Sequence, residues 1–582
     1  MAQGGTPVVD GASSPRTPLP VGAGGNSVEG SAGGVELAPV PEAAPGNGGS
    51  AVAQLPEPEP AEVGPSELAL VEATLSELRR ALETRLVTPA ALTGMYLARV
   101  RAFDDDGPRL NAFLQVNPNA VADAIALGAR CEAADAPPLC GIPVILKDNI
   151  DTADLPTTAG SVALAGSLPE RDAFVTRRLR EAGAIIIGKA TLSELANFLS
   201  TNMPSGYSSL GGFGFNPYDP RPLPGSDGRP VLTPGGSSSG SSIAVSANFA
   251  AVGLGTETAG SILSPASSNG IVGIKPTLGL VSRAGIIPIS ADQDTAGPLA
   301  RTVTDAAVVL GALAGFDAAD PATGACLEPG RCESDYTQFL DVEALDGARV
   351  AVPPFPNGRG SIMQAAIDVL EAQGARVESI DGLPGQRGTC AAVPAANNCS
   401  TVLLYGFKRD LNAYLASTPA APVSSLAALI AFNARAPGAL DYGQQLALAA
   451  QALDIGPGSA DSARYQADRT LALTSSRAAL DGVYAGEDAV LGTEDDVDAL
   501  LFSENSGAGA PASAGYPSIT VPGGFLQPSG AVRNAFPSGV TFSGPAFSEP
   551  RLIALAYAFE QATQLREPPA STPPLVTDVV RR

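Results

Sequence analysis

The stretch TPGGSSSGSSIAVSANFAAVGLGTETAGSILSP, residues 233–265, is rich in serine and glycine and lies in a 582-residue chain that contains no histidine. A serine nucleophile normally needs a neighbouring base to take its proton, and histidine is the usual base. If this stretch is catalytic, its base must therefore be another residue type. Lysine is the obvious candidate, and the chain has only four: Lys147, Lys189, Lys275 and Lys408.

The composition of the chain excludes several classes of protein. A formal net charge of -24 argues against nucleic-acid binding, because a protein that neutralises phosphates needs an excess of lysine and arginine. The same charge argues against docking on anionic lipid. No run of 18 apolar residues occurs, so no membrane span is predicted. No signal-peptide pattern is visible in the first residues.

The six cysteines fall as three pairs that are close in sequence: 131 with 140, 326 with 332, and 390 with 399. All lie in segments rich in Gly, Pro or Ala that predict loops. The pairing predicts three small disulfide loops and therefore an exported or periplasmic protein. The alternative is six reduced loop thiols in a cytoplasmic enzyme. No C-x-x-C spacing is present, so neither a metal site nor a redox site is predicted.

The pattern of apolar residues changes near residue 65. Residues 1–64 are rich in Gly, Pro, Ala, Ser and Glu, which predicts a disordered tail or tether. Beyond it, apolar residues at helical spacing predict one helix capped by Ser66 and another from about Pro89. The apolar runs 144–146 and 184–188, with a helix-like stretch at 174–183 between them, predict buried strands alternating with helices. This order indicates an α/β fold with a mainly parallel sheet.

The second half of the chain is expected to complete one catalytic domain over residues 65–575. Residues 204–232 read as a long surface loop. Helical stretches at 424–434 and 444–453 suggest that residues 400–455 form a helical cap over a cleft. Strands at 517–522 and 539–542 and a helix at 549–565 follow. We expect the substrate pocket to be built by the 195–232 and 400–455 regions.

The serine-rich stretch fits three well-known motifs poorly. Residues 236–240 match G-x-S-x-G, but that nucleophile elbow requires a histidine. The glycines suggest a phosphate cradle, yet the Gly-Lys-Ser/Thr ending of a P-loop is absent. None of the four lysines has a serine three residues before it, so a Ser-x-x-Lys site is excluded.

The chain resembles the amidase signature family of hydrolases. The resemblance rests on GIPVILKDN (141–149), GGSSSGS (235–241), GTETAGSI (255–262) and GIVGIKPT (270–277), and it continues through segments 517–523 and 542–560. It covers roughly residues 66–570 and is closest to the bacterial peptide amidase type. The resemblance implies a large mixed sheet covered by helices on both faces. It implies hydrolysis of a linear carbon–nitrogen amide bond, with no metal or cofactor.

Motif by motif, the resemblance assigns a Ser-Ser-Lys triad. Ser261 matches the nucleophile, Ser237 matches the serine whose preceding peptide bond is cis, and Lys147 matches the base. An oxyanion hole is expected from the backbone amides of residues 258–261, namely Thr258, Ala259, Gly260 and Ser261. Ala259 replaces the first glycine of the usual Gly-Gly-Ser, and Leu263 stands where many relatives have arginine. The leucine favours an uncharged or apolar substrate over a small anionic one.

The triad makes chemical sense without histidine. A free lysine has a pKa of about 10.4 and is protonated at neutral pH, but burial disfavours the charged form. Neutral Lys147 could then accept a proton from Ser237, which accepts one from Ser261. Asp148, Ser238, Thr256 and Glu257 are expected as supporting hydrogen-bond groups, and Lys275 as structural.

The predicted substrate is a small-molecule or peptide amide, either a C-terminal peptide amide or an uncharged aryl or alkyl amide. Three alternatives stay open. These are hydrolysis of esters or carbamates or acyl transfer by the same site, a tRNA-dependent amidotransferase subunit, and a catalytically inactive binding protein. The sequence does not indicate the oligomeric state.

Overall fold

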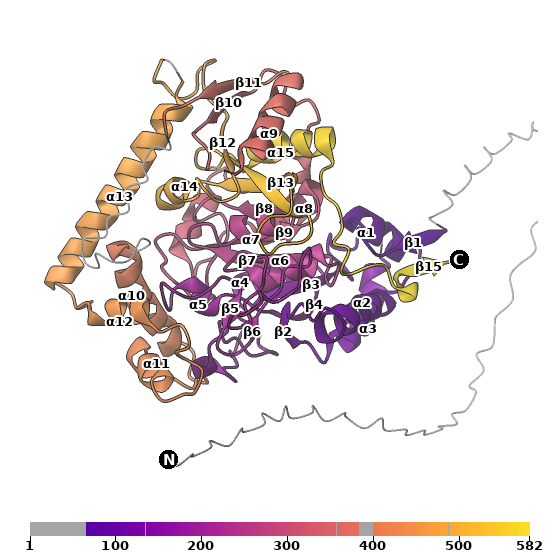
Figure 1. The fold of residues 1–582 in the computed structure, drawn as a ribbon, viewed down its shortest axis with the longest axis horizontal. Coiled ribbons are helices and arrows are strands. Elements are labelled where there is room, and N and C mark those ends of the chain that lie inside the picture. The colour runs from indigo at the N-terminus through magenta and orange to yellow at the C-terminus, as the bar shows by residue number, and fades with distance from the viewer. Residues whose placement is uncertain (1–65, 134, 357, 383–399, 487) are drawn as a thin grey trace, which may run out of the picture. The chain divides into compact units, whose positions relative to one another are not determined.

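The computed structural model describes residues 66–133, 135–356, 358–382, 400–486 and 488–582. The tail predicted for residues 1–64 lies outside this range. Within the described residues, 11 strands form one central sheet (Figure 1). Their spatial order is β11 (Arg376–Ser379), β10 (Arg349–Val352), β12 (Ala499–Ser503), β14 (Phe536–Ser543), β13 (Ser518–Leu526), β8 (Val272–Lys275), β9 (Thr295–Ala300), β7 (Val252–Glu257), β3 (Pro143–Lys147), β4 (Ile185–Ala190) and β2 (Phe113–Val116).

The sheet is mixed, as predicted, but its parallel share is smaller than the sequence suggested. Four neighbouring pairs are parallel: β3–β4, β3–β7, β10–β11 and β10–β12. The other six pairs among the described strands are antiparallel. The reason is that an apolar run reports burial on both faces of a strand and not its direction. The antiparallel strand β9 is buried along its whole length, just as β3 is.

Helices cover both faces of the sheet, as predicted. Alternate residues of β3 enter different cores: Val144 and Leu146 join the large core, and Ile145 joins a smaller one on the opposite face. Helices α1, α2, α4, α8, α9 and α15 contribute to the large core, and α3 and α6 to the smaller one. These helices are α1 (Leu75–Glu83), α2 (Pro89–Arg99), α3 (Ala120–Cys131), α4 (Phe174–Glu181), α6 (Ser239–Ser246), α8 (Val303–Leu313), α9 (Gly360–Ala372) and α15 (Glu549–Thr563).

The two ends of the described chain meet. β1 (Glu67–Ala69) pairs antiparallel with β15 (Val579–Arg581), so regular structure extends beyond the predicted limit at residue 575. The first helix also starts later than predicted. Thr74, not Ser66, caps α1, because Thr74 and Glu77 form a reciprocal capping box. The predicted second helix begins at Pro89, where its proline occupies the first helical turn.

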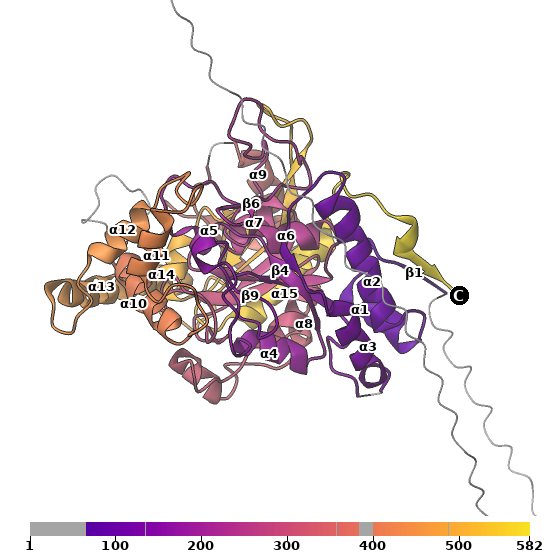
Figure 2. The ribbon, with the colours of Figure 1, turned by 90° about the horizontal axis from the view of Figure 1, so that it is seen from below.

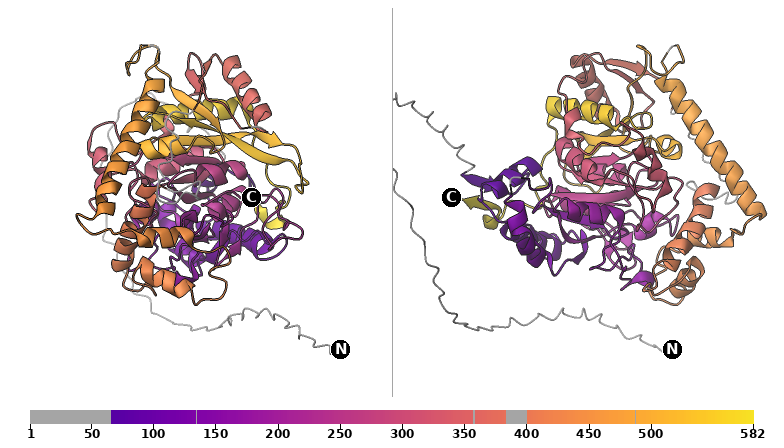
Figure 3. Two further views of the ribbon diagram at one scale, coloured as in Figure 1. Left: turned by 60° about the vertical axis from the view of Figure 1, so that its left-hand side comes forward. Right: turned by 180° about the vertical axis from the view of Figure 1, so that it is seen from behind.

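Three helices occupy the region predicted as a cap: α10 (Thr401–Ala416), α11 (Leu426–Asn433) and α12 (Gln445–Ala452). They lie together, apart from α1–α3, in the two views of Figures 1 and 2. Their apolar side chains pack on loop residues of the body, including Leu192, Phe198 and Ile289. The long helix α13 (Ala460–Tyr484) runs beside α10 and α14 (Gly509–Ala514), as Figure 3 shows. No helix in the described ranges is long and apolar enough to cross a bilayer.

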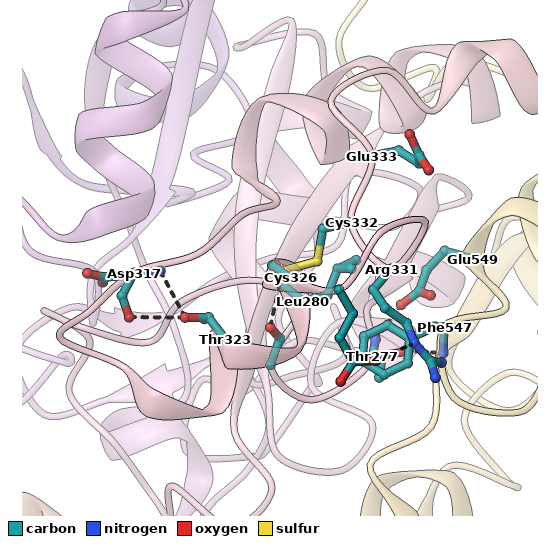
Figure 4. The surroundings of a disulfide bond; sticks show 12 residues. Thr277, Leu280, Asp317, Thr323, Cys326, Arg331, Cys332, Glu333, Phe547 and Glu549 are labelled. Atoms are coloured by element: carbon teal, nitrogen blue, oxygen red, sulfur yellow. Dashed lines mark hydrogen bonds and ion pairs between the residues drawn. A yellow bond between two sulfur atoms is a disulfide. The ribbon is translucent and has the colours of Figure 1, made fainter.

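Two of the three predicted disulfides are present: Cys131–Cys140 and Cys326–Cys332. The third pair, residues 390 and 399, lies outside the described residues. Figure 4 shows the second bridge beside Leu280, and the Cys326 sulfur lies 3.7 Å from the Leu280 carbonyl oxygen. Arg331, inside the small disulfide loop, stacks over the Phe547 ring at 4.8 Å. The bridge closes a small loop before β10, and residues of this loop contact the segment after β8 and the segment before α15.

Candidate active site

Lys147 lies at the carboxyl end of β3, an interior strand of the sheet between β7 and β4. Its side chain has 0% exposure. The ammonium nitrogen donates to the Ser237 hydroxyl at 2.7 Å, to the Thr256 hydroxyl at 2.8 Å and to the Thr256 carbonyl at 3.1 Å. Burial lowers the pKa of Lys147 to about 7, although the nearby carboxylates of Asp294 and Glu257 oppose this shift. At neutral pH the amine can therefore exist without its proton.

Ser237 lies in the turn that leads into α6, and its side chain also has 0% exposure. The peptide bond between Gly236 and Ser237 is cis, as the resemblance implies. Gly236 is required by its surroundings, because a Cβ atom there would lie 2.6 Å from the Ser193 hydroxyl. The Ser193 amide in turn donates to the Ser237 carbonyl at 3.1 Å. Close backbone packing therefore fixes Ser237 beside Lys147.

The end of β7 supplies the rest of the support for Lys147. Thr256 receives a second hydrogen bond on its hydroxyl, from the Asn149 side chain at 3.0 Å. The Ser238 hydroxyl donates to the Thr256 carbonyl at 3.1 Å and accepts from the Thr256 amide at 3.2 Å. Thr256 and Ser238 are thus supporting groups, as predicted. Asn149 has no predicted role, although it follows Lys147 by two residues in the motif Lys-Asp-Asn.

Ser261 lies between β7 and α7 (Leu263–Ser268), and it is partly exposed. Its carbonyl accepts from the Ser238 amide at 3.2 Å, which places the two serine-bearing turns side by side. Among the described residues, the Ser261 hydroxyl has no hydrogen-bond partner. The structure therefore contains the Lys147–Ser237 contact of the predicted triad, whereas the Ser237–Ser261 hydrogen bond is not formed.

One of the four amides expected in the oxyanion hole already has an acceptor in the structure. The amide of Gly260 donates to the Glu257 carboxylate at 2.6 Å, so this donor is already engaged. The amides of Thr258, Ala259 and Ser261 have no acceptor among the described residues. Gly260 adopts a φ of +86°, which an alanine would not easily adopt. The sequence alone does not show this hydrogen bond, because it does not record where a neighbouring carboxylate points.

A small cavity of about 10 Å³ lies beside the turn before Ser261, with room for about one water molecule. Its lining includes Asn149, Thr256, Thr258, Asp294 and, from the predicted 195–232 region, Ala196. Asp294 accepts from the Thr258 hydroxyl at 2.5 Å and from the amides of residues 289 and 290. Burial raises the pKa of Asp294 to about 7. No sequence pattern predicted a role for this residue.

The other three lysines have different partners. Lys189 pairs with the buried Asp148 at 3.2 Å, so Asp148 supports Lys189 rather than the serines. Lys275 donates to the backbone carbonyls of Pro276 and Tyr516, which fits the structural role expected for it. Burial lowers the pKa of Lys275 to about 8. Lys408 donates to two carbonyls at the end of α12.

The leucine at position 263 lies inside the protein and carries no charge. Leu263 has 0% exposure, so its side chain packs in the interior. It offers no charge with which an anionic substrate could pair. Within the described residues, no group of three or more Cys, Asp or Glu could hold a metal ion.

Comparisons with known proteins agree with the motifs. The model of the amidase family matches residues 91–395. A probable amidase of Arabidopsis thaliana is 39% identical over 515 residues, covering 87% of this chain and 92% of the relative. A glutamyl-tRNA(Gln) amidotransferase subunit of Synechococcus is 33% identical over 520 residues, and the match covers 85% of this chain and 99% of the relative.

Among solved structures, the native peptide amidase from Stenotrophomonas maltophilia is similar to this chain. It is 42% identical, with a TM-score of 0.74, and the match covers 86% of this chain and 99% of that one. The resemblance to the peptide amidase type is thereby confirmed. Because the family model spans more than half of the chain and the relatives match over most of their length, the chain belongs to the amidase family, the amidase signature hydrolases, and acts on the carbon–nitrogen bonds of linear amides.

Proposed function

We propose that the chain hydrolyses a linear amide through an acyl-enzyme on Ser261, with Ser237 as proton relay and Lys147 as base. One observation carries this proposal: the 2.7 Å contact between the Lys147 nitrogen and the Ser237 hydroxyl, both fully buried. A lysine whose pKa is near neutrality suits general-base catalysis, because the best base has a pKa close to the working pH.

The proton follows one route in both directions. Neutral Lys147 takes the proton of Ser237 while Ser237 takes the proton of Ser261, whose oxygen attacks the carbonyl carbon. The carbon–nitrogen bond then breaks, and the proton returns by the same route to the leaving nitrogen. Water repeats the attack on the acyl-enzyme, which releases the acid and restores Ser261. Catalytic hydrogen bonds often form fully only when substrate is bound, so we expect the Ser261–Ser237 contact to close in the complex.

Three backbone amides are proposed to hold the negative oxygen of the intermediate: those of Thr258, Ala259 and Ser261. Their support is that none has an acceptor among the described residues, and that Ala259 and Ser261 are accessible. Loss of one such donor typically costs about 10²–10³ in rate. Gly260 is left out of the proposed set because Glu257 occupies its amide.

The proposed substrate is a C-terminal carboxamide of a peptide, with uncharged aryl or alkyl amides as the next choice. The support is the 42% identity to a peptide amidase over nearly its whole length. The similarity to an amidotransferase component keeps that function as a second candidate. Activity of the isolated chain on a free amide would favour the hydrolase over the amidotransferase.

The test of this proposal uses a fluorophosphonate probe and a substrate panel. The probe should label wild-type protein, and Ser261→Ala should abolish both the labelling and the turnover. Continued labelling or turnover in that variant would overturn the assignment. The panel contains amidated peptides, aryl amides, fatty amides and carbamates. Addition of hydroxylamine then separates hydrolysis from acyl transfer, because a transferase yields the hydroxamate.

We also propose that the chain works in an oxidising compartment, outside the cytoplasm. The support is the presence of two disulfides between residues close in sequence. Mass spectrometry of the unreduced protein tests this proposal. A mass with all six thiols reduced after purification from the native host would contradict it. The helical cap over residues 400–455 and the tail over residues 1–64 stay predictions.

A further inference from the structure

The Glu257 carboxylate lies directly behind the turn that carries Ser261. It accepts hydrogen bonds from three backbone amides: Gly260 at 2.6 Å, Ile262 at 2.7 Å and Leu263 at 3.1 Å. Glu257 itself has 1% exposure and is the last residue of β7. One buried side chain at the end of an interior strand therefore holds both sides of Ser261.

The segment after Ser261 depends on that carboxylate for its hydrogen bonds. The helix α7 that follows has only six residues, too few to be stable by its own hydrogen bonds. Its first amides have no partner within the helix. Glu257 supplies the acceptor for Ile262 and Leu263, and its second oxygen binds Gly260 on the other side of the nucleophile.

The charge of Glu257 also acts on the proposed base. The side chains that face Lys147 are Ser237 from the turn before α6 and Thr256 from β7, and the charged groups that act on it are Glu257 and Asp294. Both carboxylates favour protonated Lys147 and so raise its pKa against the effect of burial. Removal of the Glu257 charge therefore shifts the titration of Lys147 to lower pH.

We propose that Glu257 is a positioning residue for amide hydrolysis. It fixes the 258–263 turn so that the Ser261 hydroxyl and the free amides of Thr258, Ala259 and Ser261 keep one alignment. It also engages the Gly260 amide, which keeps that donor from the oxyanion. This inference rests on the proposed function of Ser261.

Two substitutions separate the geometry of Glu257 from its charge. Glu257→Gln keeps the length and one acceptor oxygen but removes the charge. Glu257→Asp keeps the charge but has a shorter side chain, which cannot reach all three amides at once. The matched control is Glu549→Gln, because Glu549 is also 1% exposed and accepts from a backbone amide, that of Thr277 at 2.5 Å. Glu549 acts on the charge of Lys275 and not on that of Lys147.

The measurement is the rate of fluorophosphonate labelling of Ser261 from pH 5 to pH 9, with circular dichroism and thermal melts to confirm folding. Glu257→Gln should slow labelling at least about tenfold, since a misplacement of about 1 Å can cost about 10²-fold. Its labelling should also reach half of its maximum at a lower pH than wild type. Glu257→Asp should label slowly, and its labelling should reach half of its maximum at the same pH as in wild type. Glu549→Gln should lower the melting temperature but keep both the labelling rate and the midpoint.

A folded Glu257→Gln that labels at the wild-type rate with an unchanged midpoint would overturn the inference. If that variant does not fold, Glu257→Asp decides alone, and a wild-type labelling rate in it overturns the inference. A wild-type protein whose Ser261 is not labelled refutes the proposed function itself, and with it the role of Glu257.

Discussion

The replacement of Lys147 by methionine gives a test of the site that needs no substrate. Lys147→Met keeps the length of the side chain and removes the titrating amine. In the folded chain burial lowers the pKa of Lys147 from 10.5 to about 7. Between these two values the unfolded chain carries the proton and the folded chain does not. The unfolded state then binds more protons, so the stability of the wild type rises with pH in this window.

The size of the effect follows from the shift. Each pH unit inside the window contributes about 1.4 kcal/mol. Because Lys147 is only half deprotonated at pH 7, the wild type should gain about 2 kcal/mol of stability relative to Lys147→Met between pH 7 and pH 9. Titrating groups that do not interact with Lys147 are common to both proteins and cancel in the difference. The hydrogen bonds lost with the amine add a constant that does not depend on pH.

The assay is denaturant unfolding of both proteins at pH 7, 8 and 9, with the difference in free energy of unfolding plotted against pH. Lys275→Met is the matched control, because burial lowers the pKa of Lys275 to about 8. The window of Lys275 starts one pH unit later, so its difference should change by about 1.4 kcal/mol between pH 7 and pH 9, less than the change for Lys147. Parallel pH curves for wild type and Lys147→Met would refute the idea that Lys147 is held neutral, and with it the role of Lys147 as base.

Three further predictions concern the relay, the cap and a disulfide. Ser237→Ala should slow fluorophosphonate labelling by about 10²-fold or more, the usual contribution of positioned proton transfer, and a rate within twofold of wild type would exclude the relay. Tyr414→Phe removes the 2.7 Å hydrogen bond from α10 to Asp151 and should cost about 1 kcal/mol in denaturant unfolding. Burial raises the pKa of Asp151 to about 7, so this cost should be larger at pH 8 than at pH 6, and an equal cost at both would rule out the ionised acceptor. The double variant Cys326→Ser with Cys332→Ser should lose about 2 kcal/mol of unfolding free energy. Reduced wild type should have the same melting temperature as this variant if loss of the bridge alone is responsible.

The sequence correctly predicted which strands are buried, but it did not predict whether neighbouring strands run parallel or antiparallel. The apolar run 144–146 correctly indicated a strand buried on both faces, with Lys147 at its end. The direction of strands such as β9 depends on how distant segments connect, and no local pattern records that. The pairing of β1 with β15 has the same origin, since it joins residues about 500 positions apart.

The same division holds at the candidate site. Lys147 and Ser237 are in contact, as the order and spacing of the motifs predicted. The contacts that the motifs did not predict are those made by side chains from other segments. Asp294 reaches Thr258 from a loop 36 residues away in sequence. Glu257 is adjacent to the turn in sequence, yet only its rotamer decides that it engages Gly260.

Burial alone does not explain why Lys147, of the four lysines, is the one suited to be the base. Lys189 and Lys275 are equally buried, and burial lowers the pKa of each. The partners differ. Among the described residues Lys275 donates only to carbonyl oxygens, which have no proton to give. Lys189 does contact a hydroxyl, that of Thr157 at 2.9 Å, but its charge is balanced by the Asp148 carboxylate at 3.2 Å. Lys147 meets the hydroxyl of Ser237, which can accept a hydrogen bond from the ammonium form and donate a proton to the amine form. A pKa near 7 is therefore useful at this lysine because a hydroxyl lies within reach, and a chain without histidine obtains a base from a lysine whose partner can itself transfer a proton.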